Sequence, residues 1–149
     1  MSVFNHVGHC VSDLERSKRF YCQVLGFAFE REIEPPDEST AKLLSLEAPL
    51  SMQAAYLVRD GFVLELLHFR EPGKTQPFRA RTLDEPGLTH ISVSVDDIDA
   101  TCARVREYGG EVIESSNIGA AVVIRDPDGQ LIELLPMSYR GAIERQGFH

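Results

Sequence analysis

The sequence predicts an α+β fold built from two tandem βαβββ modules, because two motifs occur twice and in the same order. The first motif covers residues 4–14 and returns at residues 88–98. Each copy places a histidine in a short stretch rich in β-branched residues, and an aspartate just before a helical pattern. These shared residues are His6 and Asp13 in the first copy and His90 and Asp97 in the second, at a constant offset of 84 residues.

The second motif covers residues 60–67 and returns at residues 128–135, at an offset of 68 residues. The smaller offset means that the first module carries about 16 extra residues, which we place between residues 35 and 51. We therefore predict a single domain, 1–149, with four parts. They are module 1 (about 3–70), a linker rich in Pro and Gly (71–86), module 2 (about 87–137) and a C-terminal tail (138–149).

Module 1 is expected to begin with a strand over residues 6–11, in which alternate side chains point to opposite faces. Ser12 and Glu15 have the spacing of a capping box, with Ser12 as N-cap. Apolar residues then recur at helical spacing over 14–25, and Gly26 is suited to end the helix.

Module 2 repeats this order. Its first strand is followed by a helix that Asp96 or Asp97 is expected to cap and that ends near Gly109. Three strands then follow in each module. The last two are joined by turns at residues 59–61 and 126–129, which have the Asp-Gly chemistry of tight hairpins.

The composition excludes several classes of function. The 149-residue chain has a formal charge of −8, which disfavours nucleic acid and anionic lipid as partners. It has no signal-peptide pattern and no apolar run of the roughly 20 residues that a membrane span needs. Its three cysteines contain no CxxC pair, which favours a reducing compartment over a disulfide framework. We therefore expect a cytoplasmic protein without membrane or nucleic-acid partners.

Four side chains are candidates for one metal site. His6 and His90 occupy equivalent positions on the first strand of each module, and Glu65 and Glu133 lie within apolar last strands. A carboxylate is costly to bury unless a cation or hydrogen bonds satisfy it. Taken singly, such a histidine is more often a core residue and such a glutamate an edge residue. The matched pairs favour one divalent ion (Ni, Zn, Co, Mn or Fe). The remaining histidines (His9, His68 and His149) are not predicted as ligands, the first two because they are out of phase on their strands.

The residues in the segments 6–14, 20–26, 90–99 and 126–133 resemble the vicinal oxygen chelate superfamily. That superfamily includes glyoxalase I, methylmalonyl-CoA epimerase, extradiol dioxygenases, fosfomycin-resistance enzymes and bleomycin-binding proteins. The resemblance implies a glyoxalase-like U-shaped mixed sheet around a metal site. It also implies chemistry on a small molecule with adjacent oxygens or a thioester, and a homodimer.

The set His, Glu, His, Glu resembles that of glyoxalase I. Relatives of this size carry an Arg where this chain has Cys10 and an Asn where it has Phe69, so both residues are expected in the substrate pocket. Ser92 and Arg125 are also expected there. Further cations that could contact an anionic substrate are Lys74, Arg79 and Arg81.

By this resemblance the reaction is proton transfer at a carbon next to a carbonyl, as in the lactoylglutathione lyase reaction, on an α-oxo adduct of a thiol. Glu133 is the first candidate for the base and Glu65 the second. Tyr21 and Tyr56 are interpreted as core or surface residues rather than catalysts. The alternatives are a methylmalonyl-CoA-type epimerase, a metal-free antibiotic-binding protein and an Fe(II) extradiol-type dioxygenase.

Overall fold

The structure, a computed structural model, describes residues 1–140 and divides the chain into two compact units, residues 1–77 and 78–149. Each unit contains one four-stranded mixed sheet and a helix that packs against it, so the predicted α+β class is confirmed. Residues 141–149, which include His149 and most of the predicted tail (138–149), lie outside the described residues.

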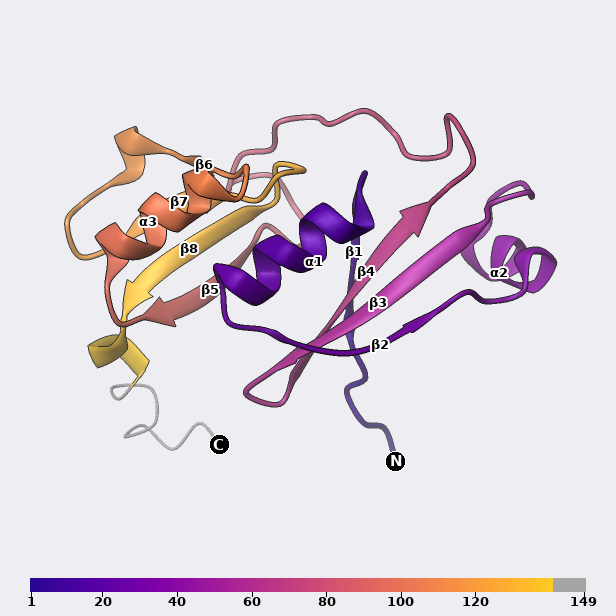
Figure 1. The fold of residues 1–149 in the computed structure, drawn as a ribbon, viewed down its shortest axis with the longest axis horizontal. Coiled ribbons are helices and arrows are strands. Elements are labelled where there is room, and N and C mark those ends of the chain that lie inside the picture. Colours follow the sequence, from indigo (N-terminus) through magenta and orange to yellow (C-terminus); the bar gives the residue numbers. More distant parts are fainter. Residues whose placement is uncertain (141–149) are drawn as a thin grey trace. The chain divides into compact units, whose positions relative to one another are not determined.

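The first unit has the strand order β1-β4-β3-β2 (Figure 1). Its elements are β1 (Val7–Cys10), α1 (Leu14–Gln23), β2 (Ala28–Ile33), α2 (Asp37–Leu44), β3 (Met52–Arg59) and β4 (Phe62–Phe69). β1 runs parallel to β4, whereas β3 is antiparallel to both β4 and β2. The parallel pair is possible because α1 and the next two strands carry the chain across before β4 returns beside β1.

The second unit has the equivalent order, β5-β8-β7-β6. Its elements are β5 (His90–Val95), α3 (Ile98–Glu107), β6 (Glu111–Val112), the 3₁₀ helix η1 (Glu114–Ser116), β7 (Val122–Arg125) and β8 (Leu131–Pro136). β5 is parallel to β8, and the hairpin β7–β8 is antiparallel, as in the first unit. The internal repeat of the sequence therefore corresponds to a repeat of topology.

The helix N-caps differ in one respect from the prediction. The N-cap of α1 is Asp13, whose carboxylate accepts a 2.9 Å hydrogen bond from the backbone N–H of Arg16, so the assignment of Ser12 was wrong. In α3 the predicted alternative Asp97 is the N-cap and accepts from Ala100 N–H at 2.8 Å. In both units an aspartate thus accepts a hydrogen bond from the backbone N–H three residues later, which has no partner within the helix.

The apolar faces of the sheets pack against α1 and α3. In the first unit Phe20 of α1 and Leu64 and Leu66 of β4 are fully buried, and in the second unit Val105 of α3 and Ile132 of β8 are also fully buried. Because side chains alternate along a strand, Glu65 and Glu133 point away from these helices, toward the opposite face of each sheet. We call this the open face of each sheet. No helix in the described part of the chain is long and apolar enough to cross a membrane.

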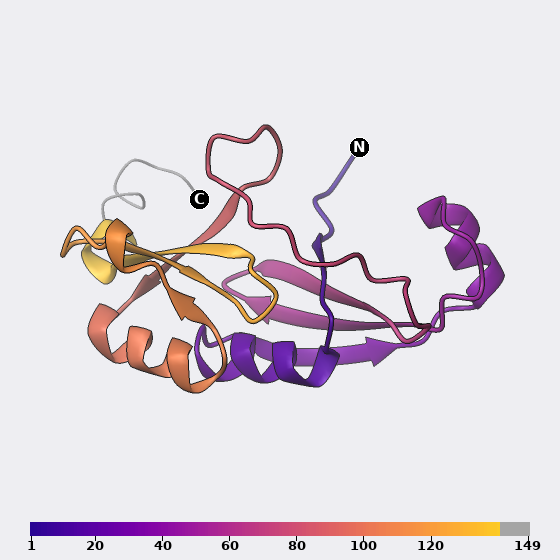
Figure 2. The ribbon, with the colours of Figure 1, turned by 90° about the horizontal axis from the view of Figure 1, so that it is seen from above.

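The extra residues of the first module form α2, which the sequence did not predict. Ala41 of α2 packs with Met52 and Ala54, and Leu67 and Phe69 contact this cluster. Those strand residues are on the open face, so α2 covers the end of the open face where Met52 and Phe69 lie. α1 lies on the other side of the sheet (Figure 2).

Candidate metal site

In the first unit the structure brings His6 and Glu65 together. His6 precedes β1 directly, and Glu65 is on the neighbouring strand β4. The Nε2 atom of His6 is 3.0 Å from Oε2 of Glu65, and the glutamate is only 8% exposed. The opposing residue on β1 is Gly8, which leaves the carboxylate free of a facing side chain.

In the second unit the corresponding residues are also neighbours. Nε2 of His90 is 3.9 Å from Oε2 of Glu133, and both side chains are about one-third exposed. The residue that pairs with Glu133 on β5 is Ser92, whose hydroxyl donates a 2.8 Å hydrogen bond to the same carboxylate oxygen. Glu133 is therefore less buried and less closely contacted by its histidine than Glu65.

The donor atoms of these pairs fit a cation. Nδ1 of His6 is 2.6 Å from the amide oxygen of Asn5, which can only accept, so in the tautomer that makes this hydrogen bond Nδ1 carries the proton. In the neutral imidazole, Nε2 then holds a lone pair that faces the Glu65 carboxylate. A lone pair and an anion at 3.0 Å repel each other unless a proton or a metal ion compensates them. His90 has a similar contact, between Nδ1 and the Thr89 hydroxyl at 2.9 Å, which also leaves Nε2 on the side of its glutamate.

The described part of the chain contains no group of three or more His, Cys, Asp or Glu side chains suited to a metal. Each unit by itself contributes a pair of donors. That all four predicted ligands share one ion stays a prediction.

Tyr56 belongs to the candidate site, although the sequence interpretation placed it in the core or on the surface. It is opposite Glu65 on β3, and its hydroxyl donates a 2.6 Å hydrogen bond to Oε1 of the carboxylate. Its ring also makes an edge contact with the imidazole of His6, at 5.8 Å between centroids. Burial, followed by the hydrogen bond to Glu65 and its charge, raises the pKa of Tyr56 to about 12. The phenol therefore remains a donor at physiological pH.

The predicted pocket residues differ in their surroundings. Cys10 is exposed, two residues beyond Gly8 on β1, and Phe69 packs on the cluster under α2. Arg125 shares the open face of the second sheet with Glu133, but its guanidinium pairs with Glu111 at 3.0 Å.

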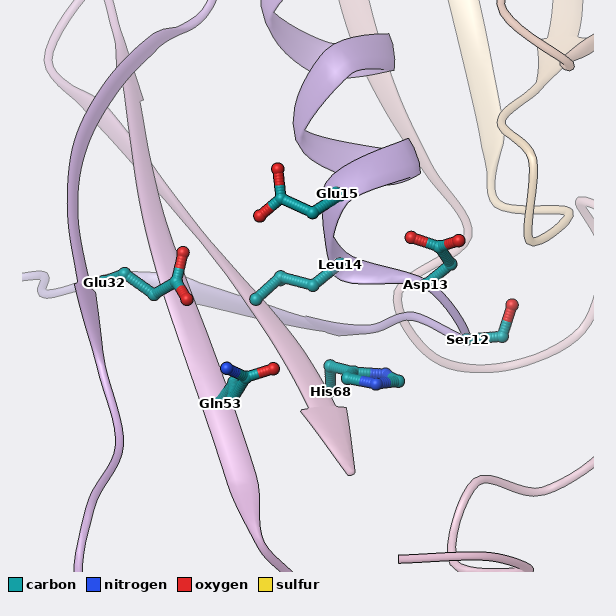
Figure 3. Close-up of a pocket in the computed structure, with 7 residues that line it drawn as sticks. All are labelled: Ser12, Asp13, Leu14, Glu15, Glu32, Gln53 and His68. Atoms are coloured by element: carbon teal, nitrogen blue, oxygen red, sulfur yellow. The ribbon is translucent and has the colours of Figure 1, made fainter. Parts of the chain in front are cut away.

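A recess of about 360 Å³ lies elsewhere in the first unit, beside the start of α1 (Figure 3). Its lining residues are Ser12, Asp13, Leu14, Glu15, Glu32, Gln53 and His68. Most of its polar groups already have partners: Asp13 caps α1, Glu15 and Glu32 both pair with Lys18, and His68 contacts the Val11 carbonyl. Because His68 is out of phase with Glu65 on β4, this recess is not on the open face.

Comparison with known proteins identifies the family. The profile of the glyoxalase/bleomycin resistance protein/dioxygenase superfamily matches residues 3–134. The chain belongs to this superfamily. A probable lactoylglutathione lyase of Synechocystis is 31% identical over 133 residues, which cover 86% of this chain and 90% of the relative. The lactoylglutathione lyase of Haemophilus influenzae is 33% identical over 131 residues, covering 84% and 85%.

Among solved structures of the superfamily, the trypanothione-dependent glyoxalase I of Leishmania major has a TM-score of 0.65. Its sequence is 23% identical, and the match covers 97% of this chain and 96% of that one. The superfamily resemblance and the glyoxalase-like fold expected from the sequence are thus confirmed.

Proposed function

We propose that this superfamily member is a divalent-metal-dependent lyase or isomerase of the glyoxalase I type. It would move a proton next to a carbonyl in an α-oxo adduct of a thiol. The observation that carries the proposal is the pairing of a histidine Nε2 with a glutamate carboxylate at the equivalent position of each unit. The lactoylglutathione lyase relatives, at 31% and 33% identity, support the same chemistry.

The residues that would hold the ion are His6, Glu65, His90 and Glu133. Two imidazoles and two carboxylates suit Ni, Zn, Co, Mn or Fe(II). When bound, the ion would act as a Lewis acid that polarises the substrate carbonyl and stabilises the charge on its oxygen. Asn5 and Thr89 keep the two imidazoles oriented, since each contacts the Nδ1 atom of the histidine that follows it.

The two glutamates have different roles in this proposal. Glu65 is buried, and Tyr56 and His6 both contact its carboxylate, so it is held in place as a ligand. Glu133 is more exposed; its carboxylate accepts a hydrogen bond from Ser92 and lies 3.9 Å from Nε2 of His90. We therefore assign Glu133 as the base that takes the proton from one carbon and returns it to the adjacent carbon. Removal of a general base of this kind lowers the rate by about 10²- to 10⁴-fold.

Metal content is the first test. Purified wild-type protein is expected to bind one divalent ion per site, and His90→Ala to lose most of that metal. His9→Ala is the matched control, because His9 is on the helix-facing side of β1 and contacts the Tyr21 ring. Wild-type protein that takes up no stoichiometric metal would contradict the proposal.

Turnover is the second test. The metal-loaded protein is mixed with methylglyoxal and glutathione, and thioester formation is followed by absorbance, with deuterium incorporation from D₂O measured in the product. We expect Glu133→Gln to retain metal but to lose about 10²- to 10⁴-fold in kcat. Glu107→Gln, an exposed glutamate at the end of α3, serves as the control. Equal activity of the two variants would exclude Glu133 as the base.

The homodimer implied by the family resemblance and the cytoplasmic location expected from the composition remain proposals. Light scattering of the metal-loaded protein tests the first, and cell fractionation tests the second.

A further inference from the structure

A row of side chains crosses the open face of the first sheet, one from each strand. The register places Arg31 of β2 opposite Tyr56 of β3, Tyr56 opposite Glu65 of β4, and Glu65 opposite Gly8 of β1. A polar chain therefore runs from the buried glutamate to the edge strand. The corresponding row of the second sheet has Val123 in the place of Tyr56. Within the described residues of the two sheets, this continuous row of polar side chains therefore occurs only in the first unit.

A β-bulge puts Arg31 on this face. Phe29 pairs with Leu57 and Arg31 pairs with Tyr56, so two steps along β2 correspond to one step along β3 and Glu30 is the extra residue. Without the bulge, Arg31 would pair with Ala55 and point to the side that α1 covers. Bulges next to active sites commonly redirect one side chain in this way.

The side chain of Arg31 is available to a ligand. Its guanidinium carbon lies 4.7 Å from the centroid of the Tyr56 ring, so the guanidinium makes a cation–π contact with the face of that ring. The residue is exposed, and no carboxylate among residues 1–140 forms an ion pair with it. Four other cations expected to meet an anionic substrate are engaged by the chain itself: Lys74 by Glu47, Arg79 and Arg81 by Glu85, and Arg125 by Glu111.

We propose that Arg31 binds a carboxylate group of the substrate and thereby selects anionic thiol adducts. This inference rests on the proposed function, because it concerns the substrate of the same site. Arg31 is two strands away from Glu65, a separation of about 10 Å at ordinary strand spacing. The substrate should therefore carry an anionic group about 10 Å from its reacting oxygens. In a chain with a charge of −8, such a group needs a local cation, and a planar guanidinium can bind a carboxylate through two hydrogen bonds.

The test compares two substrates and three variants. The substrates are the methylglyoxal adducts of glutathione and of glutathione diethyl ester, in which both carboxylates are blocked. The variants are Arg31→Ala, Arg31→Lys and the control Arg19→Ala, which removes the same charge from the exposed side of α1. Both kcat and KM are measured with the metal-loaded proteins, and binding of S-methylglutathione is measured by calorimetry.

We expect Arg31→Ala to raise KM for the free-acid adduct about tenfold or more with little change in kcat, and to leave the diester adduct unaffected. Arg31→Lys should be intermediate, and Arg19→Ala should resemble wild type. If wild type turns over the adducts but Arg31→Ala loses activity equally on both of them, or on neither, the inference is refuted while the proposed function stands. If wild type turns over neither adduct, the proposed function fails. Binding of S-methylglutathione that weakens only in the Arg31 variants would then still support the inference, and absence of that binding would overturn it.

Discussion

Tyr56→Phe removes one hydroxyl from beside a buried carboxylate, and its effect can be estimated from the structure. The phenol donates a 2.6 Å hydrogen bond to Glu65, which is 8% exposed, so water cannot readily replace the lost donor. A hydrogen bond to a charged group contributes about 1.5–3 kcal/mol, which corresponds to roughly 10- to 150-fold in an equilibrium constant. Partners that orient metal ligands contribute about 10- to 100-fold in metal affinity. We therefore expect the metal Kd of Tyr56→Phe to be about 10- to 100-fold higher than that of the wild type.

Ser92→Ala provides the comparison on the other glutamate. The Ser92 hydroxyl donates a hydrogen bond to Glu133 at 2.8 Å. The Glu133 side chain is 35% exposed, so water can replace the serine hydroxyl as donor. The expected loss is below about 1 kcal/mol, or less than about fivefold in Kd. Affinity is measured by competition with a chelator of known affinity, and Tyr139→Phe, at a residue 52% exposed, is the control. Equal Kd values for Tyr56→Phe and Ser92→Ala, or an unchanged Kd for Tyr56→Phe, would refute this reasoning.

Three further predictions concern stability and thiol chemistry. Asp97→Ala should destabilise the protein by about 1 kcal/mol in urea unfolding, because α3 loses its N-cap, and an unchanged midpoint would exclude that role. Leu66→Ala in the core should cost about 2–5 kcal/mol, whereas Leu43→Ala, at an 82% exposed residue, should stay within about 0.5 kcal/mol. Iodoacetamide at pH 8 should alkylate the exposed Cys10 first. Burial raises the pKa of Cys102, so a smaller fraction of it is the reactive thiolate at pH 8 and it should be alkylated more slowly than Cys10; mass spectrometry showing equal rates at pH 8 would contradict this.

The order of elements was predictable because the chain repeats. Two motifs at fixed offsets define two modules, and period-two alternation places Glu65 and Glu133 on the faces opposite the helices. The turns at residues 59–61 and 126–129 carry local chemistry that needs no tertiary information. Such features depend on neighbours in sequence, so a single chain is enough to recognise them.

Features set by tertiary pairing were missed. The bulge at Glu30 depends on how β2 pairs with β3, and without it the alternation places Arg31 on the wrong face. Around Tyr56, the alanines at 54 and 55 give no apolar alternation that would fix its face. Asp13 rather than Ser12 is the N-cap of α1, and the residue types alone do not separate the two positions, because Ser and Asp are both good caps.

The two glutamates show how a repeated backbone acquires unequal sites. At one position Gly8 offers no side chain, and the hydroxyl that contacts Glu65 comes from the antiparallel neighbour, Tyr56. At the other, the antiparallel neighbour is Val123, and the hydroxyl comes from the parallel neighbour, Ser92. A carboxylate held by a phenol and buried has little freedom, whereas one held by a serine and one-third exposed can reorient at small cost. An enzyme that needs one glutamate to bind and one to move a proton would benefit from this difference, because a common geometry can be kept while the mobility of the two groups diverges.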